Sequence, residues 1–191
     1  MTTLTGTTGT TLTSAAFSPA ANSLIVVEGH LDATFASVTP SISDSVGLTW
    51  TAIGSPQRGV SGGFTAGWWA FTVSAQTNMT ATINWQAGSG SLKAIKVKTY
   101  TGTASSSAVV SKSAANNGAD NNLSVNVTNT NDGCRIASTA LDWNALGAPT
   151  STDDETSYHS AGLMSGTSIH KAANTTGTGQ TVSTNFDAGG S

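Results

Sequence analysis

The sequence predicts an all-β fold, a jelly-roll-like antiparallel β-sandwich of about nine or ten strands. Short segments in which apolar and polar residues alternate recur along the 191-residue chain, separated by turns rich in Gly, Asn and Asp. Such alternation is typical of a strand with one face on a core and the other in water. No segment keeps the apolar stripe of an amphipathic helix. A long polar stretch over residues 101–122 suits a crossover between two sheets, which favours a sandwich over a closed barrel.

The stretch from Ser43 to Trp85 predicts where the core lies. It holds four of the five tryptophans, and three of its segments alternate between apolar and polar residues. Because aromatic side chains bury the largest apolar area per residue, we expect these segments to form an antiparallel meander around one core. The positions expected to face that core are Trp50, Trp69, Phe71, Ile83 and Trp85.

Trp68 is expected at a surface contact. It directly precedes Trp69, and neighbouring residues of a strand point to opposite faces. If Trp69 faces the core, Trp68 must be covered from the other side. A subunit interface is the favoured cover, ahead of the chain's own loops and of a sugar bound on the indole ring.

The remaining elements follow from local patterns. Residues 1–14 are a Thr/Gly tract, expected to be a flexible arm or an edge strand that orders on a partner. Residues 24–27 form a β-branched run that fits a central strand buried on both faces. Asp132-Gly133 predicts a hairpin between strands at 123–127 and 134–143. No change of composition separates two cores, so a single domain is expected over residues 15–191.

Composition excludes several classes of function. Charged residues make up only 9% of the chain, and Ser, Thr, Asn and Gly replace them. The few Lys and Arg residues are scattered apart from Lys93, Lys96 and Lys98, so no nucleic-acid-binding footprint is expected. Cys134 is the only cysteine and is expected to be a small core residue, because it can form neither an intrachain disulfide nor a CxxC site. No apolar run is long enough to span a membrane.

Candidate catalytic and metal-binding residues are few. Residues 59–63 match the G-x-S-x-G pattern, but the motif lies in a glycine-rich loop between strands rather than on a strand-to-helix turn. Asp153, Asp154 and Glu155 could collect a calcium ion if their loop curls, and a solvated acidic loop is the preferred interpretation. No metal site or cofactor is expected.

The histidines and the carboxylates show no catalytic pattern. His30, His159 and His170 lack the spacing of a zinc site, although His159 and His170 could be neighbours across a hairpin. Glu28 ends an apolar run and is expected to face solvent at a strand end. A glycosidase would need a pair of carboxylates, and no strand shows an inward-facing carboxylate among aromatics. No catalytic residue is therefore expected.

The segments SPAANSLIVVEGHLDA, SISDSVGLTWTAIGSP and GGFTAGWWAFTVSAQTNMTATINW resemble a β-sandwich domain of tailed-phage virion proteins. The resemblance covers roughly residues 18–100 and is weaker at 133–143. It implies a structural role on a virion, as a capsid decoration (cement) protein or as part of a tail or fibre. It carries over no catalytic residue.

We therefore expect a non-enzymatic structural protein of the virion capsid surface, made in the host cytoplasm. Its expected partners are the major capsid protein, other virion proteins and copies of itself, a trimer being the expected homo-oligomer. Neither nucleic acid nor membrane is an expected partner. The expected contact residues are Thr2, Thr3, Leu4, Thr5 and Trp68. The alternatives are a carbohydrate- or receptor-binding module of a phage tail or fibre or of a secreted protein, and a β-sandwich hydrolase.

Overall fold

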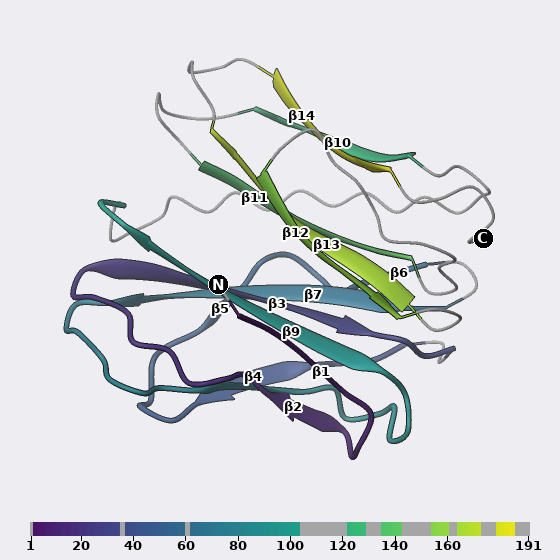
Figure 1. Ribbon diagram of the computed structural model, residues 1–191, viewed down its shortest axis with the longest axis horizontal. Coiled ribbons are helices and arrows are strands. Elements are labelled where there is room, and N and C mark those ends of the chain that lie inside the picture. The colour runs from purple at the N-terminus through teal and green to yellow at the C-terminus, as the bar shows by residue number, and fades with distance from the viewer. Residues whose placement is uncertain are drawn as a thin grey trace. The chain divides into compact units, whose positions relative to one another are not determined.

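The chain folds into antiparallel strands, as predicted (Figure 1). The computed structural model describes residues 2–34, 37–59, 62–103, 122–128, 135–142, 154–160, 164–172 and 179–185, and these residues contain no helix. They form fourteen strands, several only two to five residues long. The expected all-β class and antiparallel sandwich are confirmed.

The chain divides into two compact units where the sequence predicts one domain over residues 15–191. The first unit comprises Met1–Pro56 and Phe64–Ser111, and the second comprises Gln57–Gly63 and Lys112–Ser191. One boundary falls inside the polar stretch that we interpreted as a crossover within one sandwich. Composition does not reveal the division, because strands rich in Ser, Thr and Asn occur on both sides of that boundary.

The first unit is a sandwich of two antiparallel sheets. The strands of its larger sheet follow the order β1-β9-β3-β7-β5, and those of its smaller sheet the order β2-β8-β4. In Figure 1 the smaller sheet lies against one face of the larger one. Strands β1 to β5 alternate between the two sheets, and β7, β8 and β9 alternate again, whereas β5 and β7 both lie in the larger sheet. The bounds are β1 (Thr2–Gly6), β2 (Thr11–Thr13), β3 (Ser23–Leu31), β4 (Ser41–Asp44), β5 (Thr51–Ala52), β7 (Phe64–Thr72), β8 (Ala81–Asn84) and β9 (Lys93–Thr101).

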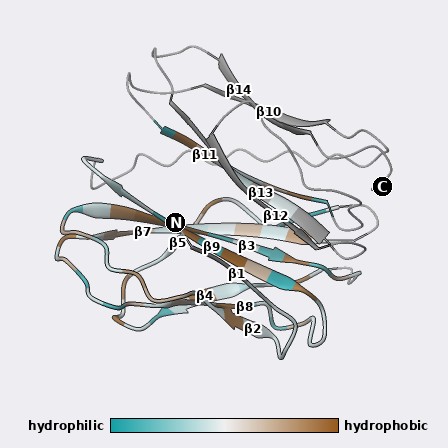
Figure 2. Cartoon of the chain, viewed as in Figure 1, coloured by the Kyte–Doolittle hydropathy of each residue, from teal (hydrophilic) through white to brown (hydrophobic). Residues whose placement is uncertain are grey.

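Three nine-residue strands, β3, β7 and β9, form the centre of the larger sheet. Figure 2 shows hydrophobic and hydrophilic residues following one another along β9. Burial alternates from residue to residue in β7, while β3 is buried on both faces over most of its length. The expectation of a central strand at residues 24–27 is therefore confirmed.

The core lies between the two sheets. It contains Ile25, Val27, Leu31, Phe64, Trp68, Met79, Ile83, Trp85, Ile95 and Val97, with smaller alanines between them. Trp50 packs against this cluster and is partly buried. The core predictions for Ile83 and Trp85 agree with the structure, because both side chains are fully buried.

A glycine in β3 makes room for the largest core side chain. Gly29 lies in phase with Val27 and Leu31, so a side chain at this position would point into the core. A Cβ atom at Gly29 would overlap the Cδ1 of Ile83 and lie 2.9 Å from the Cζ2 of Trp85. The side chains of Ile83 in β8 and of Trp85, the residue that follows β8, therefore fill the space that Gly29 leaves.

The N-terminal tract belongs to the fold of its own chain. Strand β1 pairs with β9, with Leu4 opposite Ile95, and β2 pairs with β8, with Leu12 opposite Ile83. Leu12 packs against the core. We expected a flexible arm over residues 1–14 or an edge strand that orders on a partner. The structure shows two edge strands that order on the chain itself.

The loop after β4 is organised by one carboxylate, as the Asp/Ser/Gly composition of residues 43–47 predicts. The Asp44 side chain accepts hydrogen bonds from the backbone amides of Val46, Gly47 and Leu48 at 2.7, 2.7 and 3.0 Å. It also accepts one from the Trp50 indole Nε1 at 2.6 Å. Gly47 has φ 80°, which favours glycine. Asp44 thus ties Trp50 to the strand that precedes it.

The second unit contains two small sheets in its described residues, with strand orders β10-β14 and β11-β13-β12. Strands β10 and β11 belong to different sheets, so the hairpin predicted from Asp132-Gly133 is wrong. The turn signal is local, whereas each strand pairs with a segment more than 20 residues away in sequence. The bounds are β6 (Gln57–Arg58), β10 (Asn122–Thr128), β11 (Arg135–Asp142), β12 (Asp154–Ser160), β13 (Met164–Ala172) and β14 (Gly179–Asn185).

Replacing Gly29 by alanine tests the packing of the core. We expect Gly29→Ala to lower the free energy of unfolding by about 1–3 kcal/mol, because an added methyl group in a filled core displaces its neighbours. Urea unfolding followed by tryptophan fluorescence measures the change. Gly67→Ala in β7 is the matched control, since its Cβ would have no neighbour closer than 3.6 Å. Equal losses in the two variants would contradict the packing described for Gly29.

Candidate interaction surface

The two adjacent tryptophans of β7 have the opposite phase to the one predicted. Trp68 is 6% exposed and belongs to the core between the sheets, whereas Trp69 is half-buried on the other face of the larger sheet. Phe71 shares the face of Trp69 and is also half-buried. Alternation of apolar and polar residues does not determine which of two adjacent tryptophans faces the core. Trp68 is therefore not available as a contact residue, and Trp69 and Phe71 lie outside the core cluster.

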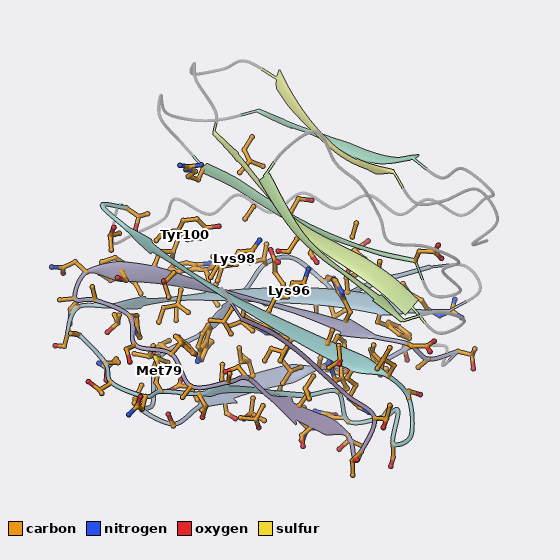
Figure 3. The ribbon with its side chains drawn as sticks, viewed as in Figure 1. Met79, Lys96, Lys98 and Tyr100 are labelled. Atoms are coloured by element: carbon orange, nitrogen blue, oxygen red, sulfur yellow. The ribbon has the colours of Figure 1, made fainter. Side chains whose placement is uncertain are left out.

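The register defines the face of the larger sheet that is turned away from the core. Residues of β9, β3 and β7 lie side by side in rows across the three strands. Figure 3 shows Lys96, Lys98 and Tyr100 in succession along β9, on the side opposite Met79. The rows are Tyr100, Leu24 and Phe71; Lys98, Val26 and Trp69; Lys96, Glu28 and Gly67; and Ala94, His30 and Thr65. The face therefore changes from aromatic to charged along the strands.

An ion pair lies in the middle of this face. The Lys98 Nζ is 3.3 Å from a carboxylate oxygen of Glu28, and both side chains are buried. We expected Glu28 to face solvent at a strand end, and that expectation is wrong because β3 continues through Leu31. Burial lowers the pKa of Lys98, and the negative charge of Glu28 opposes that shift. Two buried charges that lie this close stabilise each other, and removing one would leave the other without compensation.

His30 is held neutral beside this pair. Its pKa lies well below the usual 6.5, chiefly because burial disfavours the charged imidazolium, and secondarily because Lys96 and Lys98 repel it. The side chain is 1% exposed. A histidine in this environment is a poor general base near neutral pH, because it resists taking up a proton.

The third lysine of β9 has a structural role. Lys93 lies in phase with Ile95 and Val97 on the core side, and its side chain is buried. Its Nζ donates hydrogen bonds to the carbonyl oxygens of Gly88 at 2.6 Å and of Ser91 at 2.8 Å. Burial lowers the pKa of Lys93. The three lysines of β9 thus point to both faces of the sheet and form no common basic surface.

The outward face of the smaller sheet carries hydroxyl and amide groups and no charge. Two rows cross it: Thr11, Asn84 and Ser41 in one, and Thr13, Thr82 and Ser43 in the other. Thr11, Thr13, Ser41 and Ser43 are exposed, and a hydrogen bond of 2.8 Å joins the Thr13 and Thr82 hydroxyls. Such groups bond readily to a neighbouring surface and lose less hydration than charges do. This uncharged face did not emerge from the sequence, because its six residues come from three distant segments.

The strand β1 forms one edge of the larger sheet, and four of the five expected contact residues lie in it. Thr2, Thr3, Leu4 and Thr5 occupy consecutive register positions opposite Val97, Lys96, Ile95 and Ala94 of β9. In the residues that the structure describes, no strand pairs with the other side of β1. These residues are thus placed at a sheet edge, where backbone groups face outward.

The candidate catalytic and cation-binding groups do not assemble in the described part of the chain. At the two ends of the G-x-S-x-G segment, the Gly59 amide donates to the Gly63 carbonyl at 3.2 Å, and Ser61 falls outside the described residues. Asp154 and Glu155 lie in strand β12, whereas Asp153 and Cys134 fall outside the described residues. His159 is opposite Ser165 and His170 is opposite Asp154, so the two histidines are not neighbours across the hairpin.

Neither a metal-binding cluster nor a membrane-crossing helix occurs among the described residues. No three His, Cys, Asp or Glu side chains among these residues gather closely enough to hold a metal ion. None of their segments forms a helix of the length and apolarity needed to cross a bilayer. Comparison of the chain with protein-family models, with curated proteins and with solved structures finds no match in any of the three.

The neutral state of His30 predicts how stability depends on pH. An unfolded chain binds a proton to this imidazole near pH 6.5, whereas the folded chain binds it only at a clearly lower pH. The unfolded state therefore holds more protons between these values. We expect the contribution of His30 to be complete above pH 6.5 and to fall on acidification, by up to about 1.4 kcal/mol per pH unit.

Urea unfolding of the wild type and of His30→Gln between pH 4.5 and 8 measures this dependence. The readout is the slope of stability against pH, which a general loss of packing in the variant would leave unchanged. We expect a shallower slope in His30→Gln below pH 6.5. An NMR titration of the His30 ring in the folded protein gives the pKa directly, and an ordinary value there would contradict the description of this histidine.

Proposed function

We propose that this chain is a non-enzymatic structural protein of a phage virion that binds the capsid surface as a decoration protein. The observation that carries the proposal is the uncharged outward face of the β2-β8-β4 sheet. Its partners would be the major capsid protein or another virion protein and neighbouring copies of the chain. The proposal needs no cofactor, nucleic acid or membrane, and places the protein on the capsid surface after synthesis in the host cytoplasm.

The chemistry of that face supports adhesion to a protein surface. Outward residues of an ordinary domain are rich in charge, since charged residues make up about 25% of a typical chain. Here six outward positions on three strands carry only hydroxyl and amide groups. A face of this kind can form hydrogen bonds with a neighbour at a small cost in desolvation. The resemblance of residues 18–100 to virion β-sandwich domains supports the same conclusion.

A carbohydrate- or receptor-binding module is the second candidate. One observation favours it: Trp69 and Phe71 lie two residues apart on the face of the larger sheet that is turned away from the core, and both keep part of their surface exposed although Lys98 and Glu28 on the same face are buried. Indole and phenyl rings on a sheet can stack on sugar rings. Such a module would show tryptophan fluorescence that changes with added sugar, and Trp69→Ala would abolish the change. Trp68→Ala would damage the core instead, because Trp68 lies between the two sheets.

Adding charge to the uncharged face tests the proposal. We expect the double variant Thr11→Lys and Ser43→Lys to bind phage shells lacking this protein at least tenfold more weakly than the wild type. The physical reason is that an ammonium group must lose its hydration, or remain unpaired, at the contact. Co-sedimentation of purified protein with such shells measures the binding, and thermal unfolding checks that the double variant folds.

Val73→Lys is the matched control, because Val73 is 72% exposed and lies just beyond β7, outside the uncharged face. It adds one positive charge at a site away from that face, where the double variant adds two on it, and should bind as the wild type does. No binding of the wild type to any shell would overturn the proposed function. Equal weakening in both variants would show that the uncharged face is not the contact. Deleting residues 1–14 is not a useful test, because it removes two strands of the sandwich.

A further inference from the structure

The N-terminal tract contains a short repeat whose two copies both become edge strands. The sequence Thr-Thr-Leu-Thr occurs at residues 2–5 and again at 10–13. The first copy lies in β1, an edge strand of the larger sheet. The last three residues of the second copy form β2, an edge strand of the smaller sheet. The strands are neighbours, since a Cβ at Gly6 would lie 3.0 Å from the Cδ1 of Leu12. One side of the sandwich is thus bordered by two uncharged edges.

The edge formed by β1 lacks the usual protection against strand pairing. Natural sheets blunt an edge by charged side chains, by proline, by a bulge or by making the strand very short. The opposite edge of the same sheet is β5, which is only two residues long. Strand β1 has five residues, Thr-Thr-Leu-Thr-Gly, with neither charge nor proline, and each of them pairs in unbroken register with β9. Its outward backbone groups can therefore accept a further strand.

We propose that β1 pairs antiparallel with β1 of a second copy of this chain, with a two-fold axis at Leu4. The segment Thr3-Leu4-Thr5 reads the same in both directions. An antiparallel copy therefore places Leu4 opposite Leu4 and Thr3 opposite Thr5. Threonine favours strands, and Thr–Thr pairs across strands are stabilising. No charge on either copy of β1 opposes the approach, so the contact is self-complementary, as a two-fold interface requires.

This contact deepens the proposed function and rests on it, because linking neighbouring copies is part of how a decoration protein would strengthen a shell. A two-fold contact joins chains two at a time and continues the larger sheet from one copy into the next. It is therefore distinct from any contact that would build a trimer. Because the edge is uncharged, the association should respond little to salt.

Engineered cysteines on β1 test the pairing and its register. Residues directly opposite each other in an antiparallel pair have Cα atoms about 4.5–5.5 Å apart, which is within the range that a disulfide spans. The background is the full chain with Cys134→Ser, which removes the only native thiol. Leu4→Cys then carries one thiol at the proposed axis. Val73→Cys is the matched control for random collisions, because Val73 is 72% exposed and lies outside β1.

We expect Leu4→Cys to form a disulfide-linked dimer under mild oxidation at least tenfold faster than Val73→Cys does. Mixing Thr3→Cys with Thr5→Cys should give mixed dimers faster than either variant gives dimers with itself, because only the antiparallel register brings these positions together. The second pair of variants keeps the test valid if Leu4→Cys fails to fold, and circular dichroism checks each one. Sizing of the wild type in 0.05 and 1 M NaCl measures the salt response.

Cross-linking of all β1 variants at the rate of the Val73→Cys control would overturn the pairing. Faster cross-linking of Thr3→Cys with itself than with Thr5→Cys would overturn it too. The test uses no shells, so its failure is separate from a failure of the proposed function. If the cysteines do not cross-link in solution but a bulky label at Thr3 or Thr5 abolishes binding to shells, β1 pairs with a shell protein and the two-fold contact is wrong. If they cross-link but no shell is bound, the pairing stands and the proposed function fails.

Discussion

The arrangement of the first unit depends on the shared register of β3, β7 and β9. Because side chains alternate between the two faces of a strand, a slip by one residue would move every inward side chain outward. In the observed register Ile25, Val27, Trp68 and Val97 all face the smaller sheet. The same register brings Glu28 of β3 beside Lys96 and Lys98 of β9 on the other face. One alignment therefore determines the apolar core, the ion pair and the neutral histidine.

The fit of the core adds a second constraint. The Trp85 indole is fully buried, and its Nε1 has no hydrogen-bond partner within the described part of the chain. Leaving such a donor unsatisfied costs about 1–3 kcal/mol. The contact area of the ring offsets this cost, and Gly29 on the facing strand supplies the space. Trp50 illustrates the opposite solution, because its indole nitrogen donates to Asp44 at the margin of the core.

The sequence predicted the fold class, the central strand at residues 24–27, the turn at Asp44 and the core positions Ile83 and Trp85. It did not predict the phase of Trp68 and Trp69, because two adjacent indoles satisfy alternation in either phase. The wrong placement of Glu28 had a similar cause: the apolar run ends at that residue, but the strand continues. The division into two units and the partners of β10 and β11 depend on contacts between distant segments, which local patterns do not contain. The uncharged face of the smaller sheet was missed for the same reason.

The proposed two-fold contact requires the central claim about the N-terminus, that residues 2–6 form an edge strand paired with β9 rather than a free arm. Amide hydrogen exchange in the dilute purified chain, followed by NMR for residues 2–6, tests this claim directly. An edge strand bonds every second amide to its neighbour, so we expect alternating residues to exchange at least about 100-fold more slowly than those between them. Uniformly fast exchange over all five residues would contradict the claim.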